Sequence, residues 1–330
     1  MSEIRVNNIT NRDGSTGTTV AGIPVVDSTS HFVVPSGNTA ERGSRGRGVF
    51  GGGYAPGNSN TIDYITIATE GNASDFGDLT VARRYAGSCA SASRGLWGGG
   101  APGPSNVIDY VTISSTGNAF DFGDLTLARE GEIGTFASST RGVFSAGYSG
   151  GNTNIIDYVT IAQLGNAADF GDLTIAKNNS SGCSSPTRGL NCGSSGPNSN
   201  VIDFVTISTT GDAKDFGDLT VARAGSGALS NSTRGVIGGG QNPAAINVID
   251  YVTIASTGDA IDFGDLTSSR ISTMGCSSAT RGVFGGGNPG PSNIIDYITI
   301  LSTGNAIDFG DLTVARQGAG ACSDSHGGLG

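Results

Sequence analysis

Short runs of β-branched and apolar residues recur along the chain, separated by turns rich in glycine and asparagine. The clearest run is Val107–Ser114 (VIDYVTIS), in which apolar residues fall on both faces of an extended strand. Two runs precede it, the small-residue stretch Tyr85–Ser93 and the glycine-ended stretch Leu96–Gly100. A turn at Thr116–Ala119 separates it from a fourth run, Phe122–Leu127. The pattern predicts four short strands that are covered on both sides.

This group of strands is one copy of an internal repeat. The hexapeptide DFGDLT occurs six times, at spacings of 46, 48, 46, 47 and 46 residues, and Ile-Asp-Tyr/Phe recurs at the same spacings. Such a period is typical of a four-stranded propeller blade. Helical repeats of similar length are excluded, because the units are rich in Gly, Thr, Val and Ile. We therefore predict an all-β fold, a six-bladed β-propeller over residues 47–330.

The two ends of the repeat predict how the ring closes. The first unit begins at Arg47, at the place of a second strand, and the chain ends in a stretch of small residues. Within that stretch Cys322 stands where Cys276 stands in the preceding unit. The C-terminal strand should therefore join the N-terminal blade, because closure leaves only short, protected edges.

The composition narrows the chemistry. Of 330 residues, 56 are glycine and 14% are charged, and no apolar run is long enough to span a membrane. The net charge of −10 disfavours nucleic-acid binding. His31 and His326 are the two histidines and lie near the chain ends, which disfavours a zinc site or His-based catalysis. Five cysteines without CxxC spacing disfavour a disulfide framework. We expect no cofactor, no metal and no enzymatic activity.

Most of the charge is itself repeated. Three aspartates per unit account for 18 of the 28 acidic residues, and two basic positions account for 12 of the 18 basic residues. We expect these groups to be paired or hydrogen-bonded between blades. The alternative is that the Ile-Asp-Tyr carboxylates line the channel and bind a cation such as calcium. The Ile-Asp-Tyr aspartates and the Arg-Gly arginines are Asp63, Asp109, Asp157, Asp203, Asp250, Asp296, Arg47, Arg94, Arg141, Arg188, Arg234 and Arg281. The second basic position holds Arg83, Arg129, Lys177, Arg223, Arg270 and Arg316.

Three of the cysteines occupy one repeat position. Cys89, Cys183 and Cys276 each lie five residues before an Arg-Gly arginine, where other units have Phe136 and Leu229. A position shared by Cys, Phe and Leu indicates the apolar core.

The units differ mainly in the loop between their second and third strands, whereas the turn after the third strand is nearly invariant. Antiparallel order places these variable loops on the same face as the links between blades, where the single insertion also falls. Because surface loops carry function, this face is the predicted interaction surface, with neutral variation as the alternative. Its candidate residues are Tyr54, Pro56, Asn58, Pro102, Pro104, Glu130, Glu132, Tyr148, Asn152, Asn198, Gln241, Asn242, Asn288 and Pro289.

The loop length alternates around the ring. The distance from the Arg-Gly arginine to the Ile-Asp-Tyr isoleucine is 15, 14, 15, 14, 15 and 14 residues in successive units. Two alternating blade types predict pseudo-threefold symmetry, left by duplication of a two-blade unit or suited to docking near a threefold axis.

The repeat resembles the kelch repeat. The resemblance rests on the glycine pair Gly98-Gly99, on the acid beside an aromatic at Asp109-Tyr110, and on Arg129 opening the next unit. Kelch units usually carry tryptophan where this chain has phenylalanine, for example at Phe122, so the chain is kelch-like. The resemblance implies a protein-interaction module.

The segment 1–46 lies outside the repeat. It contains the sequence IRVNNITNRDGSTGTT, from Ile4 on, and a later VVDSTSHFVVPSG stretch. Like the GNAxDFGDLT and TRGVFGGG motifs of the repeats, this segment resembles virion proteins of marine and cyanobacterial phages. The resemblance implies a tail-fibre-like protein on the virion exterior, made in the host cytoplasm. Residues 1–46 would attach it to other virion proteins and to sister chains, with a trimer favoured. The propeller would contact a host-surface glycan or protein.

Two other functions are weighed against this one. The first is a capsid decoration protein or a general kelch-type interaction module without receptor binding. The second is a propeller enzyme such as a glycan hydrolase, which would need carboxylates clustered on one face. The acids here are spread evenly through the repeats, which disfavours the enzyme.

Overall fold

The computed structural model describes residues 19–20, 23–24 and 46–329. The chain divides into two units, Met1–Arg45 and Gly46–Gly330. In the first unit, β1 (Thr19–Val20) pairs antiparallel with β2 (Ile23–Pro24). The rest of the predicted attachment segment, apart from Gly46, lies outside the described residues.

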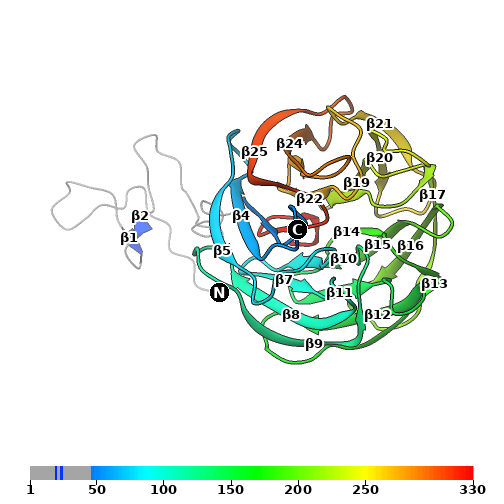
Figure 1. Ribbon diagram of the computed structural model, residues 1–330, viewed down its shortest axis with the longest axis horizontal. Coiled ribbons are helices and arrows are strands. Elements are labelled where there is room, and N and C mark those ends of the chain that lie inside the picture. The colour runs from blue at the N-terminus through cyan, green and yellow to red at the C-terminus, as the bar shows by residue number, and fades with distance from the viewer. Residues whose placement is uncertain (1–18, 21–22, 25–45, 330) are drawn as a thin grey trace, which may run out of the picture. The chain divides into compact units, whose positions relative to one another are not determined.

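Residues 46–329 form six four-stranded antiparallel sheets, arranged as blades around an axis (Figure 1). Blade 1 consists of β26 (Gly320–Ser323), β3 (Arg47–Gly51), β4 (Thr61–Thr66) and β5 (Ser74–Asp78). Blade 2 consists of β6 (Gly87–Ala90), β7 (Arg94–Gly98), β8 (Ser105–Thr112) and β9 (Phe120–Arg129), and the later blades follow in the same way, four strands each. Blades 3 and 4 consist of β10 (Gly134–Ala137), β11 (Arg141–Ser145), β12 (Thr153–Thr160), β13 (Ala168–Lys177), β14 (Ser181–Ser184), β15 (Arg188–Ser194), β16 (Ser199–Thr206) and β17 (Lys214–Arg223). Blades 5 and 6 consist of β18 (Gly227–Ser230), β19 (Arg234–Gly238), β20 (Val248–Thr253), β21 (Ile261–Asp265), β22 (Met274–Ser277), β23 (Arg281–Gly285), β24 (Ser292–Thr299) and β25 (Ile307–Arg316).

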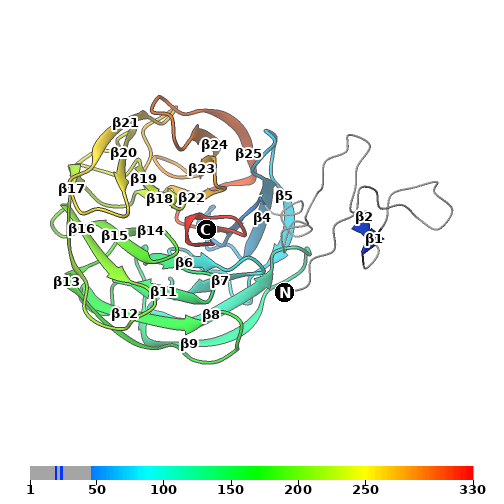
Figure 2. The same ribbon diagram turned by 180° about the vertical axis from the view of Figure 1, so that it is seen from behind.

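The predicted propeller is thereby confirmed, including its strand order. In blades 2 to 6 the strands run in sequence order from the axis outward, and in blade 1 β26 lies innermost, before β3, β4 and β5 (Figure 2). The boundaries differ by a few residues: β8 begins at Ser105, before the predicted run, and β9 extends from Phe120 to Arg129. Among the described residues, no helix has the length and apolar character needed to cross a membrane.

The ring closes as predicted. The C-terminal strand β26 pairs antiparallel with β3, with Cys322 opposite Val49. The Asp324 carboxylate then accepts hydrogen bonds from the backbone N–H groups of Gly46 and Arg47, at 2.6 and 3.0 Å. Blade 1 is thus built from both ends of the repeat region, so that unfolding of either end would open the ring.

Apolar side chains fill the spaces between blades. Trp97 on β7 is completely buried in a cluster with Val49 and Ile62 of blade 1, and its Nε1–H donates to the Gly320 carbonyl at 3.1 Å. The cysteines at the shared repeat position are buried free thiols, as predicted for a core position. The strands are therefore apolar on both faces because each blade packs against two neighbours.

Outer strands pack closely against the invariant turn of the next blade. Gly77 in DFGDLT has φ +148°, and a Cβ there would lie 2.5 Å from the Gly117 carbonyl oxygen. One residue on, the Asp78 N–H donates to the Asn118 side chain at 3.1 Å. This contact explains why the Gly-Asn/Asp-Ala turn varies so little between units.

Candidate functional site

The Ile-Asp-Tyr aspartates form ion pairs between blades. In all six blades this carboxylate is completely buried and lies beside the basic residue that ends the preceding blade. The Arg83 guanidinium donates to Asp109 at 2.7 Å and to the Trp97 carbonyl at 3.0 Å, which fixes the next blade. The pairs are Arg83–Asp109, Arg129–Asp157, Lys177–Asp203, Arg223–Asp250, Arg270–Asp296 and Arg316–Asp63. Each of these pairs therefore joins two neighbouring blades.

The structure does not fit the alternative of channel-lining aspartates, and the expectation that all repeated aspartates are paired is wrong for one position. The Ile-Asp-Tyr carboxylates lie on the third strand of each blade and are held by cations, so they do not line the channel. The first aspartate of DFGDLT, such as Asp121, is exposed in every blade, because it lies on the outermost strand. Nowhere in the described part of the chain do three or more His, Cys, Asp or Glu side chains gather as a metal site would require.

The Arg-Gly arginines stack on aromatic rings. Arg47 lies over the Tyr64 ring at 4.5 Å and donates to the Ile113 carbonyl of the next blade at 2.8 Å. Every blade repeats this arrangement, with phenylalanine in place of tyrosine at Phe204. These arginines therefore join neighbouring blades.

The predicted interaction residues all lie on one face. Backbone bridges join the variable loops to the links between blades, as between Tyr54 and Gln317 and between Tyr148 and Glu130. Among the candidates, the most exposed residues are Pro56, Pro102, Pro104, Tyr148, Asn242 and Pro289. Glu130, Gln241 and Asn288 are half-buried in the same bridges.

Three candidate asparagines have a partner within this face. Asn58 accepts from Arg84 at 2.9 Å, Asn152 donates to the Ser195 carbonyl at 3.1 Å, and Asn198 donates to the Gln241 carbonyl at 2.9 Å. These side chains connect successive loops, so their role is to hold the loops in place, and their polar groups are already used within the face.

The loops alternate in conformation around the ring. In blades 1, 3 and 5 the loop forms a bridge with itself, at Tyr54–Asn58, Tyr148–Asn152 and Gln241–Ala245. No such bridge occurs in the loops of blades 2, 4 and 6 as the structure describes them, and each of these contains a cis X–Pro bond. The predicted pseudo-threefold pattern is therefore present in the backbone.

The channel is narrow because serine hydroxyls join the innermost strands. Ser184, Ser230, Ser277 and Ser323 each donate to a backbone carbonyl of the preceding blade, at 2.6 to 2.8 Å. On the face opposite the loops, the chain end enters the axis as a short 3₁₀ turn, η1 (Gly327–Leu329). This end of the channel is closed by the chain itself.

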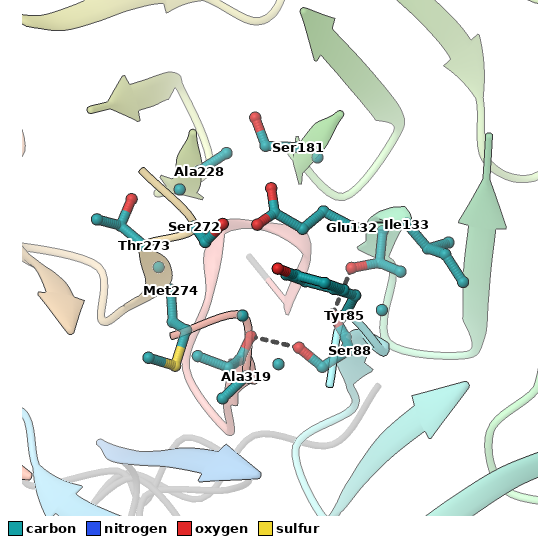
Figure 3. Close-up of a pocket in the computed structure, with 18 of the residues that line it drawn as sticks. Tyr85, Ser88, Glu132, Ile133, Ser181, Ala228, Ser272, Thr273, Met274 and Ala319 are labelled. Atoms are coloured by element: carbon teal, nitrogen blue, oxygen red, sulfur yellow. Dashed lines mark hydrogen bonds between the residues drawn. The ribbon is translucent and has the colours of Figure 1, made fainter. Parts of the chain in front are cut away.

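The other end of the channel holds a small pocket of about 90 Å³ beneath the loop face. Tyr85, Glu132 and Ser272 from the links line it, together with Ser181 and Ser226. Figure 3 shows the Glu132 side chain reaching toward Ser272, with the Tyr85 hydroxyl directed into the same space. The pocket is polar and contains one carboxylate.

Backbone hydrogen bonds between successive links frame this pocket. The residue two before each innermost strand donates to its counterpart in the preceding link: Tyr85 to Gly318, Gly318 to Ser272, and Ser272 to Gly225, at 2.6 to 3.1 Å. The pattern shifts at the insertion, where the Ser180 N–H donates to the Glu132 carbonyl. The extra residue therefore places Glu132 at a ring position with its side chain toward the axis.

Burial controls the electrostatics of the pocket. Neither carboxylate oxygen of Glu132 has a hydrogen-bond partner among the described residues. Desolvation raises the pKa of Glu132 to about 7, and the facing Ser272 hydroxyl only partly offsets this rise. Desolvation and the nearby Glu132 charge also raise the pKa of Tyr85.

Sequence reasoning included Glu132 among the loop residues and did not find Tyr85 or Ser272. Counting back from the Arg-Gly arginine, instead of forward from DFGDLT, aligns all three residues and could have found them. No protein-family model matches the chain, and no curated protein matches it. The fold shows a six-bladed β-propeller consistent with a kelch-like one, a class widely used as protein-interaction modules.

Proposed function

We propose that the chain is a non-enzymatic, tail-fibre-like virion protein of a phage. Its N-terminal segment would be held by the particle, and its propeller displayed for contact with a host-surface glycan or protein through the loop face. The main support for a contact role of the loop face is the difference between it and the opposite face, which holds the invariant turns. One face is fixed by contacts such as Gly77 with Gly117, whereas the loops vary at exposed tips such as Pro102 and Tyr148.

The virion role is supported by the sequence. The resemblance of residues 1–46 and of the repeats to phage virion proteins suggests an exterior appendage. Intertwined N-terminal segments would make a homo-oligomer, with a trimer favoured. The net charge of −10 disfavours binding to nucleic acid, which agrees with a protein on the outside of the particle.

The non-enzymatic assignment is supported by the placement of the acids. Glycoside hydrolysis generally uses two carboxyl groups that flank the scissile bond. The axial pocket contains Glu132 alone, and the buried aspartates, such as Asp109, are held by basic residues. The accessible volume of the pocket, about 90 Å³, is also smaller than that of a cavity of about 150 Å³ that holds one benzene ring.

A capsid decoration role is the second candidate. The self-bridged loops of blades 1, 3 and 5 repeat with threefold periodicity, which would suit docking on a threefold axis. This role would use the same loop face toward the particle instead of the host.

Immunogold electron microscopy with antibodies against the full chain tests the proposal and separates the two roles. Particles from a lysate that contains this chain should be labelled on tail appendages. Labelling spread over the capsid would favour decoration, and unlabelled particles would contradict a virion role.

A further inference from the structure

The axial pocket contains a carboxylate for which the described lining residues supply no counter-charge. Both oxygens of Glu132 are buried and without a hydrogen-bond partner among the described residues. Of the residues that line the pocket, none is a lysine, arginine or histidine, and Tyr85 is the one other titratable group. Arg84, which directly precedes Tyr85, donates to Asn58, lies over the Tyr54 and Tyr85 rings, and does not line the pocket. Because a buried lone carboxylate is destabilising, a cationic ligand would be favoured here.

The other polar groups of the pocket suit an N–H donor. The Ser181 and Ser226 hydroxyls lie 3.0 Å apart, and the Ser272 hydroxyl faces Glu132 (Figure 3). Hydroxyl and carboxylate oxygens all accept hydrogen bonds, whereas an ammonium group has three donors and no acceptor. A divalent metal fits less well, because Ca²⁺ takes six to eight oxygen ligands and usually several carboxylates.

The size of the pocket limits the ligand. The accessible volume of about 90 Å³ is smaller than that of an engineered cavity of about 150 Å³ that holds one benzene ring. The pocket therefore suits the end of an unbranched chain better than it suits a ring. The half-buried Tyr85 stands at the loop-face end, so the ligand would enter from the predicted interaction surface.

We propose that this pocket binds a primary ammonium group at the end of an unbranched alkyl chain, such as a lysine side chain of a partner protein, with Glu132 as its counter-ion. The site is defined by the pocket alone and does not depend on the virion role. The Tyr85 and serine hydroxyls would accept the remaining N–H donors.

Isothermal titration calorimetry on the full chain at pH 8 and constant ionic strength tests the proposal. The probes are n-butylammonium and Nα-acetyl-lysine N-methylamide, with glucosamine as the bulky control. The wild type and Asp121→Asn, which removes the same charge from an exposed position on the outermost strand of blade 2, should bind both alkyl probes with millimolar affinity. Glu132→Gln keeps the shape of the side chain and should bind both alkyl probes at least tenfold more weakly than the wild type does. The wild type should bind glucosamine at least tenfold more weakly than it binds the alkyl probes.

The affinity should also depend on pH. Since the pKa of Glu132 lies near 7, protons compete with the ligand at lower pH, while an alkylammonium stays charged. Affinity for the wild type should fall from pH 8 to pH 5.5, and Glu132→Gln should show no such trend. The proposal is overturned if no saturable binding occurs at pH 8, if Glu132→Gln binds equally, or if sodium chloride gives the same saturable response.

Discussion

The Nε2–H of His326 donates to the Ala90 carbonyl at 2.7 Å, at the point of the inner ring where no serine is available. Around the ring, a serine hydroxyl bonds the carbonyl of the preceding blade, but the residue beside Ala90 is Ala137. The other ring nitrogen, Nδ1, accepts from the Gly328 N–H at 3.1 Å. Because one nitrogen donates and the other accepts, His326 is held as the neutral Nε2–H tautomer.

Acid should therefore weaken the closed end of the channel. Burial lowers the pKa of His326, so the folded state binds this proton less readily than the unfolded state, whose pKa is near 6.5. The stabilisation is present above pH 6.5 and is lost as the pH falls through the folded pKa. Urea unfolding at pH 7.5 and 5 should show a smaller loss for His326→Gln than for wild type; equal losses would contradict this role.

Breaking one of the buried ion pairs should strongly destabilise the propeller. Replacing Asp109 by Asn leaves the Arg83 charge buried without its partner and should lower the free energy of unfolding by about 3–5 kcal/mol. Asp121 lies opposite Asp109 in the same blade but is exposed. Asp121→Asn should change the free energy by less than about 0.5 kcal/mol. Similar losses for both variants in urea unfolding would refute this assignment.

Lys177 is the one basic residue of this series that is not an arginine, and the structure shows what it lacks. The Lys177 Nζ lies 3.0 Å from Asp203 and donates to the Val201 carbonyl. Arg83 donates to the equivalent carbonyl, that of Val107, and also to the carbonyls of Gly99 and Trp97. Lys177→Arg should raise the free energy of unfolding by about 1 kcal/mol, and Arg83→Lys should lower it by a similar amount. A destabilised Lys177→Arg protein would show that blade 4 cannot hold the guanidinium.

The pocket carboxylate should destabilise the ligand-free protein at high pH. The folded pKa of Glu132 is raised to about 7, so the folded state favours the protonated form, and stability falls as the pH rises from about 4.5 to 7. Glu132→Gln should gain up to about 3 kcal/mol over wild type at pH 8 and much less at pH 5. A gain that is the same at both pH values would mean that the carboxylate is not desolvated.

The repeat made the fold predictable, because it marks the same strand in every blade. The motifs that contain Ile62 and Phe76 occur six times, so assigning four strands to one unit was enough to predict six blades. Cys322 stands where Cys276 stands in the preceding unit, and this match predicted that the C-terminal strand closes the ring. The end of the chain was less predictable. Gly327 falls where Arg281 falls, but β3 already occupies that place in blade 1, so the chain turns into the axis instead.

The pocket could not be predicted for a similar reason. Whether Glu132 points outward or toward the axis depends on where one inserted residue is absorbed, and the backbone absorbs it at Gly131, whose φ is +75°. Tyr85 adopts φ +59° at a position where two other units have glycine, a departure that the turn pattern alone does not signal. Exposed loop tips such as Tyr148 follow from the strand order and were placed on the correct face.

The central claim, that the loop face makes the contacts, is tested most directly by adsorption of the labelled full chain to host cells. Tyr54→Ala/Tyr148→Ala changes the loop face, and Leu164→Ala/Leu301→Ala changes two exposed residues in the turns of the opposite face. The loop variant should lose at least tenfold in affinity, while the turn variant should bind like wild type. Undiminished binding of the loop variant, or an equal loss in the turn variant, would contradict the account.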